Sequence, residues 1–128
     1  MGNGTPLGRV RGLGSAREGT HHWIVQRITA IGNLLAGGFL VASLLLLPDL
    51  SFGTLSEWIA GPVPATAMAL LVITTFWHAK LGLQVLIEDY VHTPGNKVAV
   101  LLALNLAVVA GIAFGLFSIA RMALGGAA

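Results

Sequence analysis

Apolar residues dominate three long stretches of this chain, and polar residues collect between them. The stretches cover residues 24–47, 63–87 and 98–120. Each is longer than the roughly 20 residues that a helix needs to cross the ~30 Å hydrocarbon core of a bilayer. The pattern therefore predicts an all-α membrane protein with three transmembrane helices.

Turn-forming and polar residues divide the chain around these helices. Residues 1–19 are rich in glycine and arginine and lack apolar periodicity, which predicts an extended or disordered tail. Thr20 is a candidate N-cap for the first helix. We expect one anchor domain over residues 20–121 and a short carboxy-terminal tail, residues 122–128. In the first loop, Trp58 predicts a headgroup-level anchor or a short interfacial helix.

The composition agrees with lipid exposure. Hydrophobic residues make up 55% of the 128 residues and charged residues only 9%, which is too apolar for a soluble core of this size. No basic run is interleaved with aromatic residues, so nucleic-acid binding is not predicted. The absence of cysteine excludes disulfides, thiolate metal sites and cysteine-held iron–sulfur clusters in this chain.

The distribution of cations orients the helices. Arg9, Arg11, Arg17 and Arg27 lie at or before the first span, the loop of residues 49–62 has no cation, and Lys97 lies in the second loop. Arg121, after the third span, argues weakly for the opposite orientation, but three arginines against none across the first span outweigh it. Because cytoplasmic loops carry an excess of lysine and arginine, the amino terminus and the second loop are predicted to face the cytoplasm.

His78 lies in the middle of the second apolar stretch. An ionisable side chain at that depth is costly and usually functional. One turn later, Gly82 leaves room for a flat ligand beside the imidazole, as an axial haem ligand would require. A neutral imidazole that hydrogen-bonds a neighbouring helix would account for the same residues. The residues alone leave both interpretations open.

Polar residues near the predicted cytoplasmic ends offer further chemistry. Arg27, with His21 nearby, could bind carboxylates such as haem propionates, or simply anchor the helix at the interface. Tyr90 could hold a quinone carbonyl while Asp89 relays a proton, or both could belong to the interfacial belt.

Small residues form stripes on the first and third helices. Such stripes allow another helix to approach closely, and they indicate packing within the chain or against a partner rather than chemistry. Their members are Gly32 and Ala36 on the first helix and Ala103, Ala107, Gly111 and Gly115 on the third.

Two segments together resemble a known family, the small hydrophobic membrane-anchor subunit of succinate dehydrogenase, which is respiratory complex II. The string HAKLGLQVLIEDY, residues 78–90, has the family's histidine followed by glycine, glutamine and a terminal aspartate–tyrosine pair. Residues 19–30 resemble the start of its first helix. Residues 88–92, EDYVH, look most like the alphaproteobacterial or mitochondrial branch.

The resemblance implies a cofactor site. His78 would be one axial ligand of a b-type haem iron, and a sister cytochrome b anchor subunit would supply the second histidine from helices packed around the same haem. Gly82 would give the haem clearance. His21 and Arg27 would lie near the haem propionates or in the quinone pocket.

The resemblance also implies a place in the respiratory chain. Tyr90 would hydrogen-bond a ubiquinone carbonyl, with Asp89 beside it in the proton path. Electrons from succinate, a tricarboxylic acid cycle intermediate, would arrive through FAD on a flavoprotein subunit and clusters on an iron–sulfur subunit. This chain would then be an anchor subunit of succinate:ubiquinone oxidoreductase rather than its catalytic core. The implied location is the bacterial inner (plasma) membrane, in preference to the mitochondrial inner membrane.

Two alternatives remain at this point. A fumarate reductase anchor would run the same chemistry in reverse with a low-potential quinone. A non-redox small membrane protein could use His78 and Lys80 as a polar site.

Overall fold

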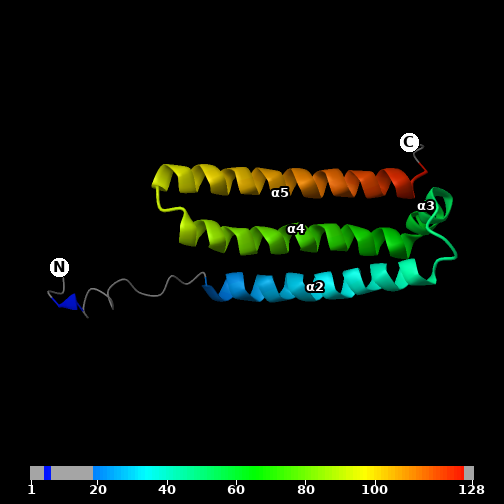
Figure 1. The fold of residues 1–128 in the computed structure, drawn as a ribbon, viewed down its shortest axis with the longest axis horizontal. Helices are drawn as coiled ribbons and strands as arrows, with labels where there is room; N and C mark the ends of the chain where they lie inside the picture. Colours follow the sequence, from blue (N-terminus) through cyan, green and yellow to red (C-terminus); the bar gives the residue numbers. More distant parts are fainter. Residues whose placement is uncertain (1–4, 7–18, 126–128) are drawn as a thin grey trace.

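The computed structural model describes residues 5–6 and 19–125, so the predicted amino-terminal tail falls almost wholly outside the described residues. The described part is helical, as predicted, and Figure 1 shows the order of its helices. Three of them are long and apolar enough to cross a membrane. They are α2 (Gly19–Leu46), α4 (Pro62–Tyr90) and α5 (Pro94–Ala123), and the short α3 (Phe52–Ala60) lies between the first two.

The long helices extend beyond the apolar spans that predicted them. α2 begins at Gly19, so Thr20 lies inside the helix and the prediction that it is the N-cap is wrong. α5 begins at Pro94, after the N-cap Thr93, because proline is tolerated in the first turn of a helix. Polar residues at the ends do not break these helices, so hydropathy alone reports only the lipid-spanning part of each.

α4 is the central helix of a flat layer. It packs against α2 on one side and against α5 on the other, while α2 and α5 do not meet (Figure 1). Few side chains are buried in such an arrangement, because a single layer leaves two broad faces open. Within the part of the chain that the structure describes, the buried residues are Thr29, Ala36, Ile59, Leu81 and Val108.

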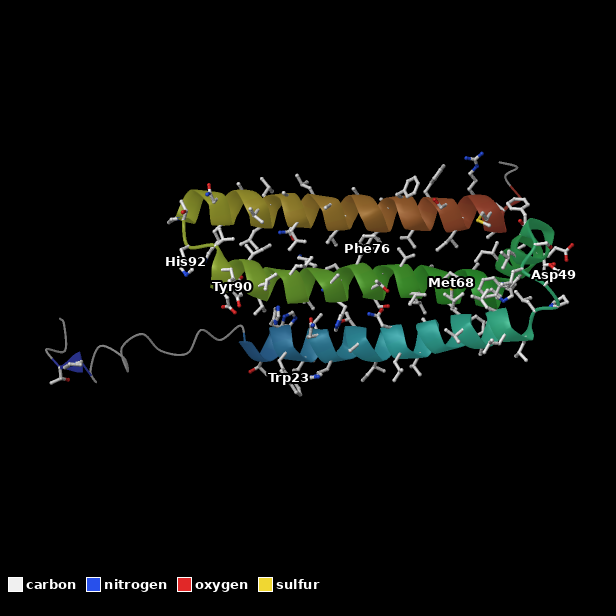
Figure 2. The ribbon with its side chains drawn as sticks, viewed as in Figure 1. Trp23, Asp49, Met68, Phe76, Tyr90 and His92 are labelled. Carbon is white, nitrogen blue, oxygen red and sulfur yellow. The ribbon has the colours of Figure 1, made fainter. Side chains whose placement is uncertain are left out.

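The α4–α5 interface is packed through glycine. A Cβ atom at Gly111 would run into the ring of Phe76, which lies between the two helices in Figure 2. A Cβ atom at Gly115 would lie 2.8 Å from Cγ1 of Val72. The predicted packing role of the α5 stripe is confirmed at these two glycines, whereas Ala103 and Ala107 are exposed.

The short helix predicted around Trp58 is present as α3, and its start is held by polar groups. Ser51 is its N-cap, and the Ser51 hydroxyl accepts from the Thr54 amide at 3.4 Å. The carboxylate of Asp49 accepts from the Ser51 amide at 2.9 Å and from the Thr54 hydroxyl at 2.7 Å. These hydrogen bonds to Ser51 and Thr54 lower the pKa of Asp49 to about 2. Trp58 stacks on Phe39 of α2, with ring centroids 6.3 Å apart.

Candidate functional site

His78 of α4 is held at the interface with α2. Its ring nitrogen Nδ1 lies 3.1 Å from the hydroxyl oxygen of Thr29. Its Nε2 lies 3.5 Å from the side-chain amide nitrogen of Gln26, a longer and weaker contact. The histidine is half-buried, and Thr29 is buried with 7% of its surface exposed. The imidazole therefore has a firm partner on one nitrogen and a loose one on the other.

This geometry bears on both interpretations of His78. The interhelical hydrogen bond is present, and it engages Nδ1. A haem iron would need Nε2, whose contact with Gln26 is near the limit of a hydrogen bond. Because an imidazole commonly ligates a metal through one nitrogen while it hydrogen-bonds through the other, the two interpretations are compatible.

The space beside His78 is open at Gly82 and is approached by a flexible side chain. A Cβ atom at Gly82 would meet only the amide nitrogen of Gln26, at 4.0 Å. The side-chain oxygen of Gln26 is buried without a hydrogen-bond partner among the described residues. Gln26 thus extends over Gly82 toward Nε2 of His78 but is poorly satisfied there, so little holds it in place.

A second polar group joins α2 and α4 one turn away. The side-chain oxygen of Asn33 accepts from the Thr74 hydroxyl at 2.7 Å and from the Thr75 hydroxyl at 3.1 Å. The Thr74 hydroxyl also lies 2.8 Å from the Leu70 carbonyl. Three polar residues of α2 thus contact α4. They are Gln26, Thr29, three positions later, and Asn33, seven positions after Gln26.

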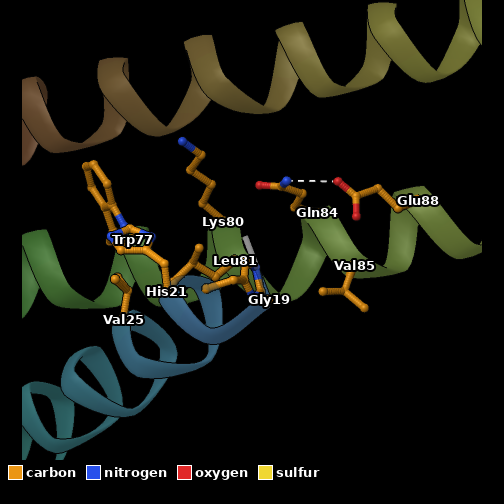
Figure 3. A pocket seen from close by; sticks show the side chains of 10 residues that line it. Gly19, His21, Val25, Trp77, Lys80, Leu81, Gln84, Val85 and Glu88 are labelled. Carbon is orange, nitrogen blue, oxygen red and sulfur yellow. Dashed lines mark hydrogen bonds between the residues drawn. The ribbon is translucent and has the colours of Figure 1, made fainter. Parts of the chain in front are cut away.

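A cleft of about 830 Å³ opens between the start of α2 and the second half of α4 (Figure 3). Its lining includes His21 and His22 of α2, and the cation Lys80 and the acid Glu88 of α4. The Nε2 atom of His22 is buried without a hydrogen-bond partner among the described residues. The lining residues are Gly19, His21, His22, Val25, Trp77, Lys80, Leu81, Gln84, Val85 and Glu88.

The polar side chains of α4 in this cleft are held by local contacts. Gln84 donates to the Glu88 carboxylate at 2.8 Å, the dashed line in Figure 3. Lys80 lies over the Trp77 ring, 5.1 Å from its centroid. Lys97, at the start of α5, donates to the backbone carbonyl of Glu88 at 2.9 Å and so places a cation at the carboxyl end of α4, where the helix dipole favours it.

Arg27 is not part of this cleft. Its guanidinium lies 5.3 Å from the ring centroid of Trp23, and Trp23 points away from α4 in Figure 2. The structure thus brings His21 to the cleft but places Arg27 on another face of α2. A ligand held by both would need to reach the outside of α2.

Asp89 and Tyr90 lie at the end of α4, next to the turn into α5 (Figure 2). Both are exposed, Tyr90 with 75% of its surface free. Neither lines the cleft. A site built on these two side chains would therefore need a covering surface from outside this chain.

Thr29 and Gln26 are the residues that sequence reasoning missed. Both lie in an apolar span, where side-chain hydrogen bonds between helices are a recurrent use of polar residues. Their spacing with Asn33 was the available signal, since three and seven residues separate positions on one helix face. In the described ranges, no group of three or more histidine, cysteine, aspartate or glutamate residues could hold a metal ion.

The chain is similar to proteins of one kind. Residues 1–114 match a family described as the succinate dehydrogenase/fumarate reductase transmembrane subunit. The hydrophobic membrane anchor subunit of succinate dehydrogenase from Rickettsia bellii is 33% identical over 98 residues, which cover 77% of this chain and 78% of the relative. The same subunit from Paracoccus denitrificans is 33% identical over 122 residues, 94% and 93% of the two chains.

Proposed function

The chain belongs to the succinate dehydrogenase/fumarate reductase transmembrane subunit family, as a membrane anchor subunit of succinate dehydrogenase, and we propose that it binds a b-type haem through His78 and helps to form the site of ubiquinone reduction. The resemblance seen in the sequence is thereby confirmed at the level of the family. The proposal for His78 rests mainly on one observation. Its Nδ1 has a close hydrogen-bond partner, whereas its Nε2 has only a long contact.

The residues around His78 fit a haem. Nδ1 is engaged by Thr29 at 3.1 Å, while Nε2 has only a 3.5 Å contact with Gln26. Gly82 leaves open space one turn further along the same helix, and the amide of Gln26 beside it has a buried oxygen without a partner in the described chain. A loosely held side chain can move aside at small cost, so a planar group can approach His78 at this place.

A b-type haem, when bound, takes up and releases single electrons. His78 would hold it by one axial bond, and a second axial histidine would have to come from the sister cytochrome b anchor subunit. Of the other described histidines, His21 and His22 line the cleft and His92 is exposed near the α4–α5 turn. The open faces of the helical layer leave room for such a partner.

The cleft beside the start of α2 supports a role for His21 toward the haem propionates or the quinone. His21 and His22 line it, and the unpartnered Nε2 of His22 adds a buried polar group that a ligand could satisfy. Arg27 would serve the same carboxylates only if they reached the outer face of α2.

Tyr90 is the proposed hydrogen-bond donor to a ubiquinone carbonyl, with Asp89 next to it in the proton path. A phenol donates one hydrogen bond, and an acid beside it can pass a proton to the reduced oxygen. The exposure of both side chains supports a site completed by the iron–sulfur subunit and the sister anchor. FAD would lie on the flavoprotein subunit. The iron–sulfur clusters would lie on the iron–sulfur subunit, since this chain has no cysteine to hold a cluster.

The proposed location is the bacterial inner (plasma) membrane, with the amino terminus in the cytoplasm. The start of α2, the end of α4 and the start of α5 lie at one end of the layer (Figure 1). Lys97 lies at this end, and in the sequence Arg9, Arg11 and Arg17 precede α2. At the opposite end the loop between α2 and α4 has no lysine or arginine, and Arg121 lies in the last turn of α5. The positive-inside rule therefore assigns this end, with Tyr90, to the cytoplasmic side.

A fumarate reductase anchor is the second candidate, since the family description covers both enzymes. The relatives from Rickettsia bellii and Paracoccus denitrificans are succinate dehydrogenase subunits, which favours the succinate direction. Comparing the rate of ubiquinone reduction by succinate with that of menaquinol oxidation by fumarate in the purified complex would decide between them.

The haem assignment is tested by the reduced-minus-oxidised spectrum of the purified complex. His78→Ala should abolish the b-type band, because the iron loses an axial ligand. The matched control is His92→Ala, at an exposed histidine outside the long helices, which should leave the band unchanged. Survival of the band in His78→Ala would overturn the assignment.

The quinone assignment is tested by Tyr90→Phe, which removes one hydroxyl and keeps the ring. Succinate-driven ubiquinone reduction should fall about 10²-fold or more, as expected when a positioned proton donor is lost. Electron transfer from succinate to a soluble acceptor should persist, because it bypasses the membrane end. Equal loss of both activities would indicate misassembly and contradict the assignment.

A further inference from the structure

Thr29 is buried against His78, and its hydroxyl donates to backbone carbonyls of its own helix. Its hydroxyl oxygen lies 2.9 Å from the Val25 carbonyl oxygen and 3.1 Å from the Gln26 carbonyl oxygen, both on its own helix. Threonine in a helix commonly donates to these carbonyls. The single hydroxyl hydrogen is then used, and toward His78 the oxygen can only accept. The 3.1 Å contact therefore requires a hydrogen on Nδ1 of His78.

The contact with Gln26 on the other side of the ring is compatible with this tautomer. With the hydrogen on Nδ1, the lone pair of Nε2 is free, and the amide nitrogen of Gln26 lies 3.5 Å from it, at the limit of a hydrogen bond. Because the Gln26 amide is loosely held and can turn, it follows the tautomer, and the assignment rests on Thr29.

The opposite tautomer would require the Thr29 hydroxyl to turn away from both carbonyls and donate to Nδ1. It would also place a hydrogen on Nε2, and a protonated nitrogen cannot bind a metal. The choice between tautomers is therefore a choice between a ring ready to bind iron and one that is not.

We infer that Thr29 is a positioning residue that holds His78 as the Nδ1–H tautomer and aims Nε2 at the haem iron, an inference that rests on the proposed haem ligation by His78. Such an N–H bond also raises the basicity of a ligating imidazole. A more basic ligand stabilises ferric iron more than ferrous iron, so this bond should lower the midpoint potential of the haem.

Thr29→Val tests the inference in the purified complex, because valine keeps the shape of threonine and removes the hydroxyl. The haem midpoint potential should rise, and haem should be retained roughly 10- to 100-fold less tightly, the usual cost of losing such a partner. Thr29→Ser, which keeps the hydroxyl, should restore both values. If Thr29→Val fails to assemble, Thr29→Ala removes the same hydroxyl without the branched side chain and takes its place.

Thr66→Val is the matched control. The Thr66 hydroxyl also donates to a backbone carbonyl four residues back, that of Pro62 at 2.7 Å, and has no contact with His78. It should leave the potential and haem retention unchanged. The inference is overturned if Thr29→Val matches the wild type, or if Thr66→Val shifts the potential as much. If haem is retained in His78→Ala, the proposed ligation is wrong, and the role of Thr29 is wrong with it. That result differs from one in which His78→Ala loses haem but Thr29→Val leaves the potential unchanged, which would overturn the role of Thr29 alone.

Discussion

The two interfaces of α4 are held by different kinds of contact. Toward α2, α4 presents His78, Thr74 and Thr75, and each meets a polar side chain of α2. Toward α5, α4 presents Phe76 and Val72, and these fit against Gly111 and Gly115. One helix therefore carries its polar groups on one side and its closest apolar packing on the other.

The two interfaces are expected to contribute differently to the stability of the protein and to its chemistry. Hydrogen bonds between membrane helices contribute about 0.6 kcal/mol each on average, because an unpaired helix finds other partners. Close packing around glycine tolerates substitution less well, since added volume there lowers the free energy of unfolding by about 1–3 kcal/mol. The α4–α5 interface can therefore hold the layer together, while the α2–α4 interface can orient His78 without carrying most of the stability.

The largest effect is expected from filling the α4–α5 interface. Gly111→Ala would drive a methyl group into the Phe76 ring and should cost about 1–3 kcal/mol, seen as a lower thermal midpoint of the purified complex. Gly38→Ala is the control, because nothing lies within 4 Å of that position and alanine favours helix. Equal midpoints for the two variants would contradict the assigned role of this interface.

A smaller effect is expected from the same change in the α2–α4 interface. In Gly32→Ala, the new Cβ would lie 2.7 Å from the methyl carbon of Thr74, whose side chain can shift only by disturbing its bond to Asn33. We expect a loss of about 1 kcal/mol in thermal denaturation. Thr74→Ser removes that methyl group and keeps the hydroxyl, so the double variant should recover most of the loss. Failure of this rescue would show that the contact is not the cause.

A still smaller effect is expected from the polar contacts alone. Asn33→Leu removes the acceptor of Thr74 and Thr75, but the Thr74 hydroxyl keeps the Leu70 carbonyl at 2.8 Å. The cost should stay near ~1 kcal/mol or below, measured as above. Asn105→Leu is the control, since Asn105 bonds only within α5 in the described structure. A loss larger than that of Gly111→Ala would reverse the ranking of the two interfaces.

The smallest effect is expected at α3, which closes one end of the layer. Hydrogen bonds to Ser51 and Thr54 lower the pKa of Asp49 from 3.8 to about 2. The lowered pKa means that the ionised form stabilises the start of α3 above pH ~3.8, and that this stabilisation is lost as the pH falls toward 2. The protection of the α3 amides from hydrogen exchange, taken relative to the intrinsic exchange rate at each pH, should therefore decrease in that range.

Asp49→Asn should remove this pH-dependent step, because an amide does not titrate. Glu57→Gln changes an acid within α3 and should leave the step in place. If the pH-dependent step persists in Asp49→Asn, another group causes it.

The candidate site shows how far sequence reasoning reached. His78 stood out because an imidazole is rare in an apolar span, and its pattern with Gly82 and the Asp89–Tyr90 pair carried the family resemblance. Thr29 and Gln26 did not stand out, because neither is ionisable. Their importance depends on contacts with a residue about fifty positions away, which no local pattern contains.

The three long helices and the family of the protein follow from the amino-acid sequence alone. In lipid every backbone polar group must be satisfied within its own segment, so long apolar stretches have to form helices whatever their neighbours are. The central position of α4, the separation of Arg27 from the cleft and the contact between Nδ1 of His78 and Thr29 become visible only in the packed helices. Lipid is as apolar as the packed interior, so hydropathy does not mark which side of a membrane helix faces its neighbour.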